Sequence, residues 1–317
     1  MKRILITGIT GYIGSNLARR LLPECEVYGL VREPLNLTYL EDIQEQIHFV
    51  YYDGTYESMS NAVNVSQPDL VYHLATYYTG AHGREHTPRL ISSNITLGAY
   101  LLEVMADWGC SALVNASTVM AYYKGEGYRP LNLYAATKQA LSDLMAYYTD
   151  AGLVRAVTLM LSDTYGPNDH RPKILNLIKK AVQSGEKLAL SEGGQDYDLV
   201  HIDDVTRAFQ AAGKQLLQNP GWKDETFQIG AGKVLTLRET VECMLQVNQV
   251  KLNAGWGERP SPEREIRQAV RVYPPLPGWQ PEVSLENGLR DFVDGYSAGN
   301  MELDCNAFKI RYAMRGT

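Results

Sequence analysis

The 317-residue sequence is poor in cysteine, and what little it has is scattered. Its four cysteines are Cys25, Cys110, Cys243 and Cys305. They form no C-x-x-C pair and have no histidine at zinc-ligand spacing, so we expect neither a metal site nor a disulfide framework. Reduced, unpaired thiols are typical of a cytoplasmic protein, and we predict that location.

The sequence also lacks basic clusters and long apolar runs. The formal net charge is -6 and no block of Lys and Arg stands out, which argues against a nucleic-acid partner. The N-terminus, MKRILITGITGYIG, reaches glycines after only a few apolar residues. That run is too short for a signal peptide or a membrane span, so we expect no membrane partner.

What the chain does contain is enough apolar sequence for a sizeable core. Apolar residues make up 45% and charged residues 21%, which indicates a folded protein. A length of 317 residues suits either one large α/β domain or a nucleotide-binding domain with an attached lobe.

Strand-like and helix-like segments alternate along the first half of the chain. Helical periodicity appears at Tyr12–Leu22 and Leu90–Trp108. The strand-like runs are Arg3–Thr7, Glu26–Val31, His48–Tyr52, Leu70–Leu74, Ala112–Asn115 and Ala156–Leu161. This alternation predicts βαβ units, and hence an α/β fold with a Rossmann-type, doubly wound parallel sheet.

Beyond about Tyr165 the regular alternation ends and proline-rich stretches interrupt the chain. A later strand-like run, Thr226–Gly230, can return to the main sheet. We therefore expect a dinucleotide-binding domain in 1–167, with 196–232 returning to it. A smaller substrate lobe would comprise 168–195 and 233–317, of which the stretch from about Ala298 carries no readable signal.

The most informative stretch is ILITGITGYIGSNLARRLL, a strand followed by glycines and then an amphipathic helix. Gly8, Gly11 and Gly14 let the backbone turn sharply and approach a pyrophosphate. The amide groups at the positive end of the following helix would meet its charge. Because the motif follows a predicted strand and opens a predicted helix, it predicts dinucleotide binding.

Further motifs occur in one order over about residues 1–210. They are TGITGYIG (7–14), Asp53 at the end of the third strand, HLA (73–75), NAST with Tyr122, YAATK (134–138), TYGP (164–167) and DLVHIDDV (198–205). Together they resemble the extended short-chain dehydrogenase/reductase family, the NAD-dependent epimerase/dehydratase group, which acts mostly on nucleotide sugars. A weaker match lies in GWQPEVSLENGL (278–289).

The resemblance implies a catalytic set of Thr118, Tyr134 and Lys138. The family tyrosine is the acid/base at a substrate carbonyl or carbinol, and the family lysine holds the nicotinamide ribose. A phenol has a pKa of about 10, and a nearby ammonium together with the nicotinamide charge favours its ionised form. The hydroxyl of Thr118 would polarise the substrate oxygen, with Ser117 as its rival if the register slips by one residue.

The cofactor is expected to be NADPH, because Arg32 stands where NAD-preferring members usually carry an acid. A guanidinium suits a 2'-phosphate by charge and by its forked geometry. Glu33 next to it keeps NAD possible. The expected cofactor-binding residues are Gly8, Gly11, Tyr12, Ile13, Gly14, Arg32, Asp53, Gly54, Leu74, Ala75, Tyr134 and Lys138.

The reaction type follows from what stands beside the threonine. Family dehydratases carry Asp and Glu directly after it, but this chain has Val119 and Met120, which move no proton. We expect a ketoreductase. NLYAATKQA and DTYGPND are similar to reductases of CDP-linked 4-keto-3,6-dideoxyhexoses, the abequose synthase type. An NAD-retaining 4-epimerase is the alternative, and a non-catalytic dinucleotide-binding sensor or scaffold is a third reading.

The substrate side departs from the family pattern. Asp163 and Tyr197 stand where epimerases commonly carry Asn and a diphosphate-gripping Arg. Replacement cations are available at Arg171 and Lys173, or at Arg259 and Arg264. The expected substrate-binding residues are Tyr78, His82, Thr118, Asp163, Arg171, Lys173 and Arg264. The partners implied are a nucleotide sugar and, as in relatives, a second copy paired through the helices that follow Arg89 and Tyr134.

Overall fold

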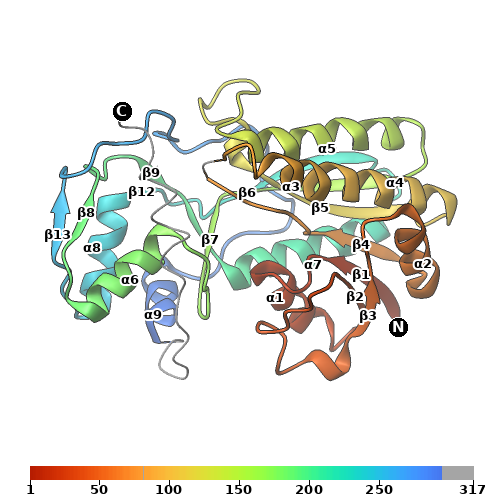
Figure 1. Cartoon of the computed structure of the whole chain (residues 1–317), viewed down its shortest axis with the longest axis horizontal. Helices are drawn as coiled ribbons and strands as arrows, with labels where there is room; N and C mark the ends of the chain where they lie inside the picture. The colour runs from red at the N-terminus through yellow and green to blue at the C-terminus, as the bar shows by residue number, and fades with distance from the viewer. Residues whose placement is uncertain (81, 295–317) are drawn as a thin grey trace.

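A computed structural model describes residues 1–80 and 82–294. Its centre is a seven-stranded sheet in the order β11-β6-β5-β4-β1-β2-β3 (Figure 1). All its neighbouring strands are parallel. The strands are β1 (Lys2–Thr7), β2 (Cys25–Val31), β3 (His48–Tyr51), β4 (Leu70–His73), β5 (Ala112–Thr118), β6 (Arg155–Leu161) and β11 (Asp224–Ile229). The predicted Rossmann-type doubly wound fold is confirmed.

Helices cover both faces of this sheet because its strands alternate apolar side chains to both sides. One face packs against α1 (Tyr12–Leu21) and α7 (Ile202–Gln218). The other packs against α2 (Tyr56–Ser66), α4 (Leu97–Asp107) and α5 (Leu133–Asp150). Two separate apolar cores therefore hold α1 and α5 on opposite sides of the same strands.

The order of the strands reverses at β1. The chain goes from β1 to β2 and β3 in one direction, then returns to β4, β5 and β6 on the other side of β1. Loops at the carboxyl ends of β1 and β4 diverge at such a point and leave a crevice between them. This crevice is where the glycine turn after β1 and the chain that follows β4 meet.

The later part of the chain forms a smaller lobe with its own core (Figure 1). Its helices are α6 (Ile174–Ser184), α8 (Leu237–Val247) and α9 (Leu285–Asp294). Three two-stranded sheets accompany them: β7 (Asp163–Tyr165) with β10 (Leu199–His201), β8 (Leu188–Leu190) with β13 (Ala254–Trp256), and β9 (Asp196–Tyr197) with β12 (Leu235–Thr236). The segment 196–232 supplies α7 and β11 to the large layer. On this basis we propose the division that the sequence predicts, with 1–167 and 196–232 in the dinucleotide-binding domain and the rest in the smaller lobe.

Two segments differ from the sequence-based expectation. Strand β5 runs past its predicted end at Asn115 to Thr118, so the Thr118 hydroxyl lies at the carboxyl end of the strand. The predicted helix Leu90–Trp108 is interrupted: α3 (Thr87–Ile91) passes into a π-helical turn, η2 (Ser92–Thr96), before α4 begins. Short 3-10 turns, η1 (Gln44–Gln46) and η3 (Val119–Ala121), complete the described elements. Cys305 lies outside the described residues.

The DLVHIDDV stretch ties the smaller lobe to the large sheet. Asp204, in the first turn of α7, has a side chain only 1% exposed. Its carboxylate accepts the backbone N–H of Glu282 at 3.0 Å and of Val283 at 3.1 Å, and it pairs with Arg207. Asp198 plays a similar part, accepting from Ser162 Oγ at 2.6 Å.

We predict that Asp204→Ala lowers the free energy of unfolding by about 3 kcal/mol, because it leaves Arg207 and two N–H groups without their buried acceptor. Urea unfolding followed by tryptophan fluorescence measures this. Asp203→Ala is the matched control. The side chain of Asp203, next to Asp204 in the sequence, is 62% exposed, so its removal should change the free energy of unfolding little. Equal losses in the two variants would contradict the proposed tie.

Candidate functional site

A cavity of about 2090 Å³ lies at the crevice, between the large sheet and the smaller lobe. Its wall comes from the glycine turn, the chain after β4 and β5, the first turn of α5, and segments of the smaller lobe. Pockets for one small ligand usually measure about 300–1,000 Å³. The cavity therefore has room for two ligands side by side.

The glycine turn leaves no space for side chains. Gly8 has φ +73°, and a Cβ there would lie 2.6 Å from the backbone nitrogen of Ala75. A Cβ on Gly14 would lie 2.2 Å from the carbonyl oxygen of Gly8. Helix α1 begins directly after Gly11, with no side-chain cap and no acid in its first turn. Its amide groups therefore remain available to an anion in the cavity.

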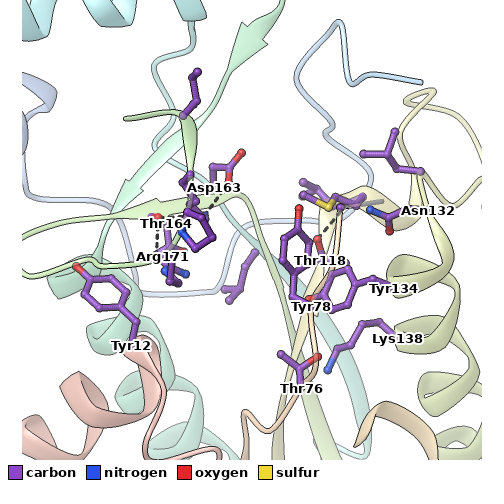
Figure 2. A pocket seen from close by; sticks show the side chains of 18 of the residues that line it. Tyr12, Thr76, Tyr78, Thr118, Asn132, Tyr134, Lys138, Asp163, Thr164 and Arg171 are labelled. Carbon is purple, nitrogen blue, oxygen red and sulfur yellow. Dashed lines mark hydrogen bonds and ion pairs between the residues drawn. The ribbon is translucent and has the colours of Figure 1, made fainter. Parts of the chain in front are cut away.

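Tyr134 and Lys138 lie one turn apart on α5, and both line the cavity. Asn132 begins this helix by accepting the N–H of Ala135 at 2.9 Å, which fixes Tyr134 in the first turn. The ring of Tyr78 meets the Tyr134 ring edge-on, with centroids 4.9 Å apart. Figure 2 shows Tyr134 and Lys138 on one side of the cavity and Tyr12 on the other.

The pKa of the Tyr134 phenol is raised, not lowered as the sequence suggested. Burial is the largest cause and Tyr78 adds to it, while contact with the Thr76 hydroxyl and the charge of Arg171 act in the opposite direction. With the protein's own groups alone, burial prevails. At neutral pH the phenol is therefore protonated and can act as an acid.

Lys138 is the least expected member of this set because it is a buried cation. Its side chain is 2% exposed, and burial lowers the pKa of its ammonium to about 8. Within residues 1–80 and 82–294 the ammonium has no hydrogen-bond or ion-pair partner. A buried charge of this kind calls for oxygen acceptors, which ribose hydroxyls in the cavity would supply.

Thr118 is the last residue of β5 and lies on the same side of the cavity as Tyr134 and Lys138 (Figure 2). Its oxygen accepts the N–H of Met120 at 3.3 Å, and its own hydroxyl hydrogen can be donated to an oxygen in the cavity. Ser117 lines the same cavity, so both hydroxyls stay candidates. The neighbouring wall is apolar and includes Val119, Met120, Leu131, Leu133, Leu161 and Val270.

The expected cofactor residues divide into two groups. Gly8, Gly11, Tyr12, Ile13, Gly14, Arg32, Leu74 and Ala75 line the cavity. Asp53 and Gly54 are not among its lining residues: Asp53 accepts from Thr55 N at 2.9 Å and Thr55 Oγ1 at 2.7 Å, and these bonds with Ser58 lower its pKa to about 2. Their place in cofactor binding remains a prediction.

At the end of β2, Arg32 and Glu33 are held differently. Arg32 Nη1 donates to Ser93 Oγ at 3.4 Å, and its guanidinium lines the cavity. The Glu33 carboxylate accepts the N–H of Leu35 at 3.1 Å, which engages it within its own turn. Both residues line the cavity, and each already has one hydrogen-bond partner.

All of the expected substrate residues line the cavity, but the cations among them already have partners. Lys173 Nζ donates to Asp163 at 2.8 Å. Arg264 donates to the carbonyl oxygens of Leu131 at 2.8 Å and Pro130 at 2.6 Å. The ring of Tyr78 makes an edge-on contact with the ring of Tyr134, and the side chain of His82 is exposed.

Arg171 is anchored most firmly of these. It forms a two-pronged ion pair with the buried Asp169, at 2.7 and 2.6 Å. Its guanidinium also lies 4.5 Å from the ring centroid of Tyr12. Arg171 thus ties the smaller lobe to the glycine turn while its charge acts on Tyr134.

Asn94 is a contributor that sequence reasoning missed. It is buried in the π-helical turn, where it accepts the N–H of Tyr77 at 2.7 Å and donates to Thr137 Oγ1 at 2.9 Å. It therefore links the loop after β4 to α5 beside Lys138. The signal available in the sequence was the polar run SSNIT (92–96) within a helical stretch that is otherwise largely apolar.

Two kinds of feature are absent from the described part of the chain. No helix there has the length and apolar character needed to cross a lipid bilayer. No group of three or more His, Cys, Asp or Glu side chains is placed to hold a metal ion there.

Comparison with known proteins places the site in context. The sequence model of the NAD dependent epimerase/dehydratase family matches residues 4–230. A CDP-abequose synthase from Yersinia pseudotuberculosis is 30% identical over 80% of this chain and 88% of that protein. A UDP-glucuronate 4-epimerase from Thermodesulfobacterium geofontis is 28% identical over 94% of this chain and 97% of that protein.

Solved structures show the same fold. The crystal structure of UDP-glucose 4-epimerase from Thermus thermophilus in complex with NAD superimposes with a TM-score of 0.79 at 24% identity. The match covers 94% of this chain and 100% of that one.

We predict that Gly8→Ala weakens dinucleotide binding by about tenfold or more, because its Cβ would force the turn away from Ala75. Gly152→Ala is the matched control: Gly152 has φ +71° but nothing within 4 Å of its Cβ. Both variants carry the same backbone strain of about 1–2 kcal/mol. Isothermal titration with NAD and NADPH measures binding, and unchanged affinity in Gly8→Ala would contradict the prediction.

Proposed function

The chain belongs to the NAD-dependent epimerase/dehydratase family, and from that premise we propose that it is an NADPH-dependent reductase of the 4-keto group of a nucleotide-linked deoxyhexose. The observation that carries the proposal is the protonated, half-buried Tyr134 one turn from the buried Lys138, whose ammonium has no partner among the described residues. Both lie in a cavity large enough for cofactor and substrate together.

The protonation state of Tyr134 favours reduction over the reverse reaction. Reduction of a ketone consumes a proton, so its acid must begin protonated. Oxidation of an alcohol, the first half of an epimerisation, must begin with the phenol ionised. Because burial raises the pKa of Tyr134, the protein's own groups prepare the first of these states.

The residues have separate tasks in this proposal. Tyr134 gives its proton to the carbonyl oxygen as that oxygen gains charge, while Thr118 donates a hydrogen bond to the same oxygen. Lys138 holds ribose hydroxyls, and its charge stabilises the phenolate that Tyr134 leaves behind. Bound nicotinamide supplies the hydride. The shape of the glycine turn and the free donors of Lys138 fit such a cofactor.

The sugar is proposed to be a deoxyhexose for two reasons. The relative that is 30% identical over 80% of this chain is named CDP-abequose synthase, the type that the sequence motifs resemble. The wall around Thr118 and Tyr134 is built largely of aliphatic side chains and Met120. Such a wall suits a sugar with few hydroxyl groups, because each buried hydroxyl without a partner costs binding energy.

NADPH is the proposed cofactor because the guanidinium of Arg32, which lines the cavity beside Glu33, carries the charge and the forked geometry that suit a 2'-phosphate. NAD is the alternative, since a structural neighbour at TM-score 0.79 was solved with NAD. We also propose a cytoplasmic homodimer formed through α4 and α5, because Leu144 and Tyr147 on α5 are exposed apolar side chains.

A nucleotide-sugar 4-epimerase is the second candidate. The relative named UDP-glucuronate 4-epimerase matches 94% of this chain, more than the 80% matched by the abequose synthase from Yersinia pseudotuberculosis. An epimerase of this kind would retain NAD through purification and consume no reduced cofactor. A reductase would exchange its cofactor and consume one equivalent for each sugar reduced.

We predict NADPH oxidation with a CDP-linked 4-keto-deoxyhexose when a panel of CDP-, TDP- and UDP-4-ketohexoses is tested with both cofactors. Tyr134→Phe should lower turnover by about a thousandfold, since it removes the proposed proton donor, while NADPH binding stays unchanged. Full activity in this variant would refute the mechanism. Cofactor binding without oxidation of any panel member would favour a non-catalytic sensor.

We predict that Arg32→Gln lowers kcat/KM for NADPH by about tenfold or more, because it removes the charge that faces the 2'-phosphate, and leaves the value for NADH nearly unchanged. Glu33→Gln is the control and should alter neither value appreciably. A parallel loss with both cofactors in Arg32→Gln would show that Arg32 does not select between them.

A further inference from the structure

A row of buried polar side chains crosses the sheet beneath α5. Thr7, His73, Asn115 and Thr158 occupy partnered positions on β1, β4, β5 and β6. Partnered residues on parallel strands point to the same face of a sheet. The residues two positions earlier in these strands belong to the apolar core under α4 and α5. The polar row therefore faces those helices, and Lys138 lies on α5.

Two atoms of this row lack hydrogen bonds. His73 Nε2 and Asn115 Oδ1 are both buried and have no partner among the described residues. The charge of Lys138 acts on His73 and, together with burial, lowers the pKa of His73 to about 3, so the imidazole is neutral. Buried polar atoms are almost always paired, and those that are not call for an explanation.

The hydrogen bonds at the other end of His73 allow either tautomer, because the Thr7 hydroxyl can donate to Nδ1 or accept from it, so the neighbouring ammonium decides between them. Thr7 Oγ1 accepts the N–H of Ala75 at 3.1 Å and lies 2.9 Å from His73 Nδ1. If Nδ1 carries the proton and donates to Thr7, Nε2 presents a lone pair. The other tautomer would set an N–H donor against the ammonium of Lys138 and leave both without acceptors.

Asn115 supplies a second acceptor in the same row. Its amide nitrogen donates to Thr158 Oγ1 at 3.4 Å, which leaves Oδ1 as the unpaired atom. The ammonium of Lys138 has three donors, and none is used within the described part of the chain. Two buried acceptors in this row therefore lack partners, and Lys138, on the helix that this row faces, has donors unused among the described residues.

We propose that His73, with Asn115 beside it, is a positioning residue that holds the ammonium of Lys138 by accepting its hydrogen bonds through one internal water. Further donors of the ammonium then remain for the cavity. The inference rests on the proposed function only for the role of Lys138 in turnover. The hydrogen-bonding set itself does not depend on it.

The consequence is a measurable change in the pKa of Lys138. Acceptors favour the charged form of an amine, whereas burial disfavours it. The titratable groups facing Lys138 are His73 from β4 and Tyr134 from the same helix, with Arg171 acting on Tyr134 from the smaller lobe. Burial alone lowers the pKa of Lys138 to about 8, and acceptors would raise it from there. Removal of an acceptor should therefore lower the pKa of Lys138 relative to that in the unaltered protein.

The test is an NMR titration of the full chain labelled with ¹³Cε-lysine, in which the Lys138 signal is assigned by its loss in Lys138→Met. We expect His73→Leu to lower the pKa of Lys138 by about one unit. His73→Gln keeps an acceptor near the position of Nε2, so the pKa of Lys138 in this variant should stay close to that in the unaltered protein. Thr158→Val, at the far end of the row, is the matched control and should cause no shift.

An unchanged Lys138 pKa in His73→Leu, or failure of His73→Gln to restore it, would overturn the inference. If His73→Leu does not fold by circular dichroism, Asn115→Leu removes the second acceptor at similar volume and should lower the same pKa. Because the titration needs no substrate, a shift without turnover would refute the proposed function alone. Turnover without a shift would refute this inference alone.

Discussion

The buried ammonium of Lys138 is the constraint on which the site depends. Helix α5 packs its apolar side chains against the sheet, and Lys138 is buried with them. Burial lowers the pKa of the Lys138 ammonium to about 8. An unpaired charge in such a place is costly unless acceptors surround it. The cavity on one side and the polar row on the other supply places for those acceptors, so one lysine links the core of the fold to the chemistry of the site.

The strand order makes this arrangement possible. Because the order reverses at β1, the glycine turn, the end of β4 and the end of β5 open onto one crevice. The smaller lobe lies over it, and its contacts with the large layer include Arg171 against the ring of Tyr12 and the carboxylate of Asp204. From this lobe the charge of Arg171 acts on Tyr134 and opposes the effect of burial on its pKa.

Local motifs were sufficient to predict the sheet, the glycine turn and the spacing of Tyr134 and Lys138, because these depend on residues close in sequence. The contact of Arg171 with the ring of Tyr12 and the pairing of Arg264 with Pro130 and Leu131 were not predictable in this way. Nor was the raised pKa of Tyr134, since sequence spacing reveals a neighbouring cation but not the extent of burial. The unpaired atoms of His73 and Asn115 were not predictable either, because they depend on the register of four strands that are far apart in the sequence.

The central claim is that a proton from Tyr134 accompanies net reduction of a sugar ketone. The most direct measurement uses NADPH deuterated at the transferred position of nicotinamide C4, a CDP-linked 4-keto-deoxyhexose, and mass spectrometry with NMR of the product. The account predicts one deuterium at C4 of the sugar and one equivalent of oxidised cofactor for each product molecule. Recovery of the 4-keto sugar without deuterium and without oxidised cofactor, together with 4-epimerisation of the matching CDP-linked 4-hydroxy sugar, would contradict it.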